Sequence, residues 1–138
     1  MEFLWKAISG IINRQISSSI KFHDVLHGFC AGRGTGTATP KANLLQPLID
    51  MRETVICSIL LDMCKAYDDL DRYQCLDILT GYGVGLRTIR ILRTYWVRIQ
   101  MAAKEGGRYR PLFQSHRGVT QCYPLSPKIF NVVVDNVI

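Results

Sequence analysis

Residues 54–71 read TVICSILLDMCKAYDDLD, a continuous apolar run that gives way to an acid-rich turn. The apolar part, residues 54–61, alternates little, which is typical of a short strand covered on both faces. Asp62 follows directly, and a carboxylate at the end of a sheet can hold a hard cation such as Mg²⁺, which prefers oxygen ligands. The alternative for Asp62 is an ordinary turn residue at the end of the strand. Asp69 and Asp71 are better explained as capping groups of the next helix.

Upstream of this segment, apolar residues recur with helical spacing. Residues 3–20 predict an amphipathic helix, and residues 28–37 predict a glycine-rich loop. Thr39 and Pro40 have the pattern of an N-cap followed by the first helical position, so we expect a second helix that ends near Arg52. Its apolar face would consist of Leu44, Leu45, Leu48 and Ile49.

Downstream of this segment, the sequence predicts two further helices. Asp71 is placed to cap a helix that ends by Gly81 or Gly83. The second helix is expected from Leu86 to about Met101. It is basic, with Arg87, Arg90, Arg93 and Arg98.

The last part of the chain predicts a hairpin followed by a helix. The glycines of the turn at residues 105–107 lie between two plausible strands, so residues 98–117 favour a β-hairpin. Pro124 and Pro127 break the chain before a final helix that contains Phe130 and several valines. The predicted fold class is therefore α+β, one domain with a small antiparallel sheet backed by helices.

The composition fits a basic globular domain. The chain has 138 residues, 48% of them apolar, and 17 Lys and Arg against 11 Asp and Glu give a formal net charge of +6, which favours contact with phosphates. No stretch approaches the roughly 20 apolar residues of a membrane helix. The N-terminus lacks the layout of a signal peptide, so we expect an intracellular protein of the nucleus or cytoplasm that is not secreted and contacts no membrane. The five cysteines form no CxxC pair, which argues against a zinc site and favours reduced thiols.

Three segments resemble the sequence motifs of reverse transcriptases. Residues 61–68, LDMCKAYD, resemble motif A, in which an Asp is followed by three residues and then by Ala, an aromatic residue and Asp. Residues 118–127, GVTQCYPLSP, resemble motif B, which the family writes as G-x-x-Q-G-D-P-L-S-P. Residues 28–35, GFCAGRGT, resemble the fingers motif G-F-R-x-G-R-S-T. The three occur in the family's order, and the likeness is to the non-LTR retroelement and group II intron type.

The resemblance implies a partial right-hand polymerase fold, with residues 1–53 as a fingers-like part and residues 54–138 as an incomplete palm. It also implies RNA-directed DNA synthesis from deoxynucleoside triphosphates on an RNA or DNA template–primer, with Mg²⁺ as the cofactor. Phosphoryl transfer of this kind uses two metal ions about 3.5–4 Å apart. By resemblance, Asp62 would be the catalytic carboxylate that bridges the ions, and the backbone carbonyl of Met63 would add an oxygen ligand.

By the same resemblance, Tyr67, Gln121 and Arg33 would bind the nucleotide. The ring of Tyr67 would lie under the incoming sugar and exclude a ribose 2′-hydroxyl; the alternative is core packing. The amide of Gln121 would contact the nucleotide or the template pair; the alternative is a loop hydrogen bond. Arg33 would reach the nucleotide phosphates from the fingers; the alternative is a solvated loop charge.

The chain departs from the family's motifs at several positions. Cys122 stands where motif B has a glycine, and its side chain would intrude where a glycine permits close approach or an unusual backbone angle. Tyr123 stands where Asp is usual, and Cys30 replaces an arginine of the fingers motif. Motif C, with its paired aspartates, would be expected shortly after Asn136.

Without the aspartates of motif C, we expect these 138 residues not to polymerise DNA, because one carboxylate screens two Mg²⁺ ions poorly. An incomplete palm would also leave an unpaired strand edge, through which we expect self-association. Two alternatives stay open: a basic module that binds nucleic acid through its arginines, and a decayed relic without activity.

Overall fold

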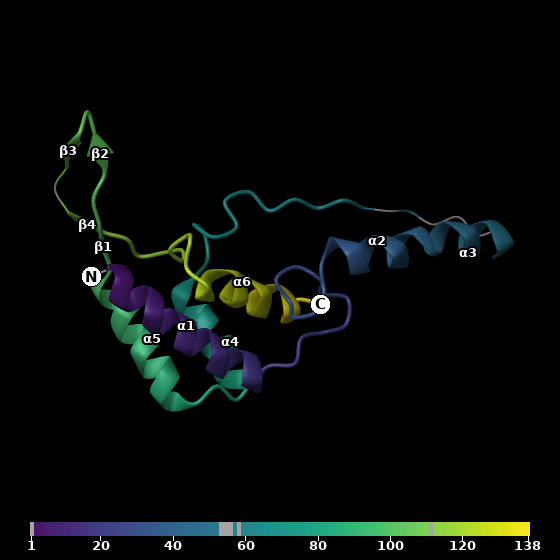
Figure 1. Cartoon of the computed structure of the whole chain (residues 1–138), viewed down its shortest axis with the longest axis horizontal. Helices are drawn as coiled ribbons and strands as arrows, with labels where there is room; N and C mark the ends of the chain where they lie inside the picture. Colours follow the sequence, from purple (N-terminus) through teal and green to yellow (C-terminus); the bar gives the residue numbers. More distant parts are fainter. Residues whose placement is uncertain (1, 53–56, 58, 111) are drawn as a thin grey trace.

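A helical body forms the centre of the molecule. The structure is a computed structural model that describes residues 2–52, 57, 59–110 and 112–138. The body consists of α1 (Glu2–Ser19), α4 (Arg72–Gly81), α5 (Leu86–Arg98) and α6 (Leu125–Asp135). In Figure 1 these helices lie together, whereas α2 (Thr35–Asn43) and α3 (Leu45–Arg52) extend away from them.

The core lies between the four helices of this body. Helix α4 contacts both α5 and α6, and α1 contacts α6. The predicted helix over residues 3–20 is confirmed by α1, which buries Ile12 and Ile16, one turn apart, on its inner face. Burying a side chain of this size stabilises the fold by about 1.5–3 kcal/mol. Fully buried partners on the other helices include Leu79, Leu92, Ile129 and Val132.

The predicted hairpin is confirmed, but it is not backed by helices. Strands β1 (Gln100–Met101) and β4 (Phe113–Gln114) pair antiparallel, as do β2 (Lys104–Glu105) and β3 (Arg108–Tyr109). Gly106 and Gly107 connect β2 to β3 with φ of 56° and 80°, as a tight hairpin turn requires. Most residues of these strands are exposed, and the hairpin stands out from the helical body (Figure 1). The α+β class therefore holds, while the core is made mainly by helices and the loops between them and not by a sheet.

The prediction of a strand over residues 54–61 is wrong for those residues of this range that the structure describes. Residues 57 and 59–61 adopt no strand, and Ile59, Leu60 and Leu61 are 81%, 98% and 89% exposed. A strand needs a hydrogen-bonded neighbour, and every strand pairing among the described residues involves residues 100–114. Residues 54–56 and 58 lie outside the described residues.

The single helix predicted from Thr39 to about Arg52 is two helices, α2 and α3, separated at Leu44, and the first begins earlier than expected. Helix α2 starts at Thr35, because the N–H of Gly34 donates to Thr37 Oγ1 and closes the first turn, so Pro40 lies inside the helix. Helix α3 ends at Arg52, as expected. The leucines of the expected apolar face are exposed, so they do not contribute to the core.

Two further boundaries differ from the prediction. Helix α5 ends at Arg98 instead of near Met101, because the chain there enters β1. Helix α6 starts at Leu125 and so includes Pro127 in its first turn. A proline is tolerated there, since the first N–H groups of a helix have no partner within the helix.

Candidate functional site

The motif A segment, residues 61–68, ends in a closed turn that leads into α4. Lys65 has a φ of 51°, and its carbonyl accepts hydrogen bonds from the N–H groups of Asp68 (2.9 Å) and Asp69 (3.1 Å). Asp71 then caps α4, as predicted, by accepting from the N–H groups of the second and third residues that follow it, at 2.8 and 3.1 Å. The turn is thus fixed by local hydrogen bonds at both ends.

The start of the segment that resembles motif B, residues 118–119, lies directly against this turn. The N–H of Gly118 donates to the carbonyl of Leu70, and the N–H of Val119 donates to the carbonyl of Tyr67, both at 2.8 Å. Gly118 has a φ of 78°, and a Cβ atom placed on it would lie 2.5 Å from the carbonyl oxygen of Asp68. Only a glycine fits this close approach. We call this contact between residues 67–70 and residues 118–119 the A–B junction.

Arg72, the first residue of α4, donates hydrogen bonds to the A–B junction, and this role was not predicted from the sequence. It is 5% exposed, and its five N–H groups all find acceptors. These are the carbonyls of Gly118 (2.6 Å), Trp96 (3.1 Å), Ser115 (2.5 Å) and Arg117 (2.9 Å), and the hydroxyl of Ser115 (3.1 Å). Burial lowers the pKa of this guanidinium from its ordinary value.

The sequence did carry a signal for Arg72. It shares the helical spacing of the buried residues Cys75, Leu76 and Leu79 on α4, which places it on the inner face of the helix. Because arginines are mostly exposed, Arg72 was not expected in the core.

Tyr67 and Gln121, expected to bind the nucleotide, both lie at the A–B junction. The half-buried ring of Tyr67 lies 5.5 Å from the ring of Phe130 on α6, with an angle of 42° between the planes. The amide nitrogen of Gln121 is 3.5 Å from Asp68 Oδ1, the outer limit of a hydrogen bond. The contacts seen for both side chains are therefore those of the structural alternatives, core packing and a loop hydrogen bond.

Asp62 and Met63 precede the A–B junction in an extended, exposed segment. Met63 is 59% exposed and lines a groove of about 380 Å³, together with Leu70 and Phe130. In the part of the chain that the structure describes, no three His, Cys, Asp or Glu residues come together as metal ligands. Two ions about 3.5–4 Å apart need several carboxylates. The donors among the described residues therefore do not fit a two-ion centre.

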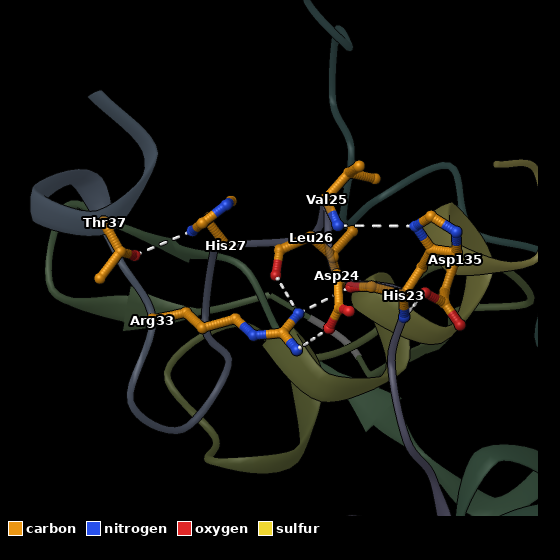
Figure 2. A network of polar contacts seen from close by, with 8 residues as sticks. All are labelled: His23, Asp24, Val25, Leu26, His27, Arg33, Thr37 and Asp135. Carbon is orange, nitrogen blue, oxygen red and sulfur yellow. Dashed lines mark hydrogen bonds and ion pairs between the residues drawn. The ribbon is translucent and has the colours of Figure 1, made fainter. Parts of the chain in front are cut away.

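Arg33, the third residue expected to bind the nucleotide, is engaged within its own loop. Figure 2 shows its guanidinium directed at the loop backbone: Nη1 donates to the carbonyls of His23 (2.7 Å) and Leu26 (3.0 Å). Nη2 forms an ion pair with Asp24 at 2.7 Å. A phosphate would therefore have to compete with Asp24 for this side chain.

Asp135 is a second residue whose role sequence reasoning missed. Its carboxylate accepts from the N–H of His23 at 2.7 Å (Figure 2). It also accepts from the hydroxyl of Tyr82 at 2.5 Å, so it joins α6 to the loop before α2 and to the end of α4. Burial and the bond to this carboxylate raise the pKa of Tyr82 to about 12. Asn131 makes a second connection between α6 and the loop before α2, because its amide donates a hydrogen bond to the carbonyl of Gly28 at 2.6 Å.

Cys122 has a backbone conformation that favours glycine. Its φ is 67°, in the left-handed region that side chains with a Cβ rarely occupy. The thiol is exposed, so the departure from the motif is accommodated by backbone strain and not by a clash in the core.

Comparison with protein families, with curated proteins and with solved structures finds no match to the chain. Among the described residues, no helix combines the length and the apolar character that crossing a membrane requires.

Proposed function

We propose that the chain derives from the reverse transcriptase of a non-LTR retroelement or group II intron-like element, and that these 138 residues alone do not polymerise DNA. The observation that carries the proposal is the A–B junction. Two segments that resemble separate polymerase motifs meet through backbone hydrogen bonds from Gly118 and Val119, around a glycine that no other residue can replace. A chance pairing of two motif-like strings would not be expected to produce such a contact.

The roles within this site follow the resemblance. Asp62 would be the carboxylate ligand of Mg²⁺, with the Met63 carbonyl beside it. Mg²⁺ sites commonly use one or two carboxylates and complete their shell with substrate phosphates and water. A single exposed Asp can thus contribute to holding one ion on a bound nucleotide, but not to the two-ion chemistry of synthesis. Tyr67 and Gln121 would face the sugar and the base pair.

The proposal is tested with purified chain and a primer–template. We expect no incorporation of deoxynucleotides in the presence of Mg²⁺, together with Mg²⁺-stimulated retention of a deoxynucleoside triphosphate. Asp62→Asn should abolish that stimulation, while Lys41→Gln, on the distant α2, should leave it unchanged. Metal-dependent primer extension would overturn the predicted inactivity. An equal Mg²⁺ response in wild type and Asp62→Asn would overturn the role of Asp62.

A second candidate function, binding of single-stranded nucleic acid, is favoured by the outer face of α5. Arg90 and Arg98 line an open groove of about 430 Å³ together with Trp5 and Tyr95. The two aromatic rings stack with centroids 3.4 Å apart and an angle of 11° between the planes. Arginines that reach phosphates beside an aromatic surface for bases are the combination that binds single strands with little sequence preference.

This second function has a distinct signature. Binding should weaken steeply with salt, and the double change Arg90→Gln and Arg98→Gln should flatten the dependence of log K on log[salt] by about 1–2, since each lost phosphate contact lowers the slope by about 0.7 for a single strand. Asp62→Asn should have no effect on this binding. A salt-independent interaction would exclude the candidate.

A further inference from the structure

The flank of α5 that faces α4 holds a cavity that shares Arg72 and Ser115 with the network at the A–B junction, but includes none of the residues expected to bind metal or nucleotide. It has a volume of about 140 Å³ and lies between α4, α5 and residues 114–116. Arg72, Arg93, Trp96, Ser115 and His116 are among the residues that line it. No Asp or Glu of the described residues lines this cavity. The two arginines that line it, Arg72 and Arg93, therefore have no compensating carboxylate in its wall.

The charged guanidinium of Arg72 donates its hydrogen bonds only to neutral acceptors. Its five donors go to four carbonyls and one hydroxyl, and no Asp or Glu of the described residues forms an ion pair with it. A buried charge without a counter-ion is costly in a medium of low dielectric constant. An anion in the adjoining cavity would lower that cost.

Direct donors toward such an anion are also available. Arg93 is exposed on α5, and within the described residues neither its guanidinium nor the imidazole of His116 has a hydrogen-bond or ion-pair partner. The guanidinium fork is suited to binding two oxygens of one phosphate. Both free groups thus line the cavity that Arg72 makes electropositive.

We propose that this cavity binds a phosphate group, with Arg93 and His116 as its direct ligands and Arg72 as the buried charge behind them. The volume is below the roughly 300–1,000 Å³ of sites for drug-sized ligands, so it suits one tetrahedral oxyanion and not a whole nucleotide. The phosphate can be a free ion or part of a nucleic-acid backbone. The inference does not rest on the proposed polymerase origin, because none of Asp62, Tyr67 and Gln121 lines the cavity.

Trp96 lines the cavity, so its fluorescence can report binding there. The chain has one other tryptophan, Trp5. A Trp5→Phe background leaves Trp96 as the single emitter. Titration with inorganic phosphate is expected to change its emission saturably. Arg93→Gln should weaken this binding about ten-fold or more, the loss expected for a charge-assisted hydrogen bond. His116→Gln should weaken it as well, and Lys41→Gln, which removes one charge from α2, should leave it unchanged.

Titration with a short oligothymidylate separates the two sources of phosphate. A Trp96 response to the oligonucleotide that Arg93→Gln removes assigns the cavity to a nucleic-acid backbone, and a response to inorganic phosphate alone assigns it to the free ion. Absence of a saturable change with either probe up to roughly 10 mM phosphate, ten times a Kd of 1 mM, overturns the proposal. So does equal weakening by Arg93→Gln and Lys41→Gln, since that would reflect only the net charge.

Discussion

Replacing Gly118 by alanine tests whether the two motif-like segments are fastened as the structure shows. An L-residue in the left-handed region is disfavoured by about 1–2 kcal/mol. The added methyl group would also lie 2.5 Å from the carbonyl oxygen and 2.8 Å from the Cα of Asp68, both backbone atoms that cannot rotate away. The loop must therefore move.

That movement would break the bonds that the glycine and its neighbour make. The N–H groups of Gly118 and Val119 bond to the turn, and the Gly118 carbonyl accepts from Arg72 at 2.6 Å. Each such bond contributes about 0.5–1.5 kcal/mol, and more where a charged donor is left unsatisfied. With the backbone strain, we expect Gly118→Ala to lower the free energy of unfolding by about 3–5 kcal/mol, a large part of the roughly 5–15 kcal/mol of a typical domain.

Urea unfolding followed by tryptophan fluorescence and circular dichroism measures this loss. Gly83→Ala is the matched control, because Gly83 has nearly the same φ (79° against 78°) but no atom within 4 Å of an added Cβ. It should lose about 1 kcal/mol, from backbone strain alone. If Gly118→Ala lowers the free energy of unfolding no more than Gly83→Ala does, Gly118 does not lie against the backbone of Asp68 and the A–B junction does not form.

Three further changes test other strained and buried groups of the fold. Cys122→Gly should raise the free energy of unfolding by about 0.5–1 kcal/mol, because it relieves the left-handed strain, and Cys122→Ala should show no gain in the urea midpoint. Arg72→Lys keeps the charge but supplies three donors instead of five, so we expect a loss of about 2–4 kcal/mol in the same assay; an unchanged midpoint would contradict its bonding. For Tyr82, the folded state favours the protonated hydroxyl because its pKa is raised from 10 to about 12. The stabilisation is thus complete below pH 10 and is lost as the pH rises toward 12. The free energy of unfolding of Tyr82→Phe should therefore depend less on pH than that of the wild type between pH 10 and 12. Parallel pH curves for the two proteins would exclude the bond to Asp135.

The sequence alone determined the features that depend on neighbours along the chain. The helical periodicity of residues 3–20, the capping of α4 by Asp71 and the hairpin turn at Gly106 and Gly107 all follow from contacts within a few residues. The resemblance of the strings around Tyr67 and Gln121 to polymerase motifs is likewise a property of the sequence alone. A strand, in contrast, depends on a partner, which is why residues 59–61 do not follow their apolar pattern.

Only the tertiary structure decided which polar groups hold the molecule together. Arg72 reaches Gly118 across 46 residues, and Asp135 reaches Tyr82 across 53 and His23 across 112. Neighbours along the chain do not show which partners these side chains meet, because their role arises when distant carbonyls, hydroxyls and N–H groups converge on them and replace water. The need for a glycine at position 118 has the same origin: it is set by the backbone of Asp68, which the fold places against it.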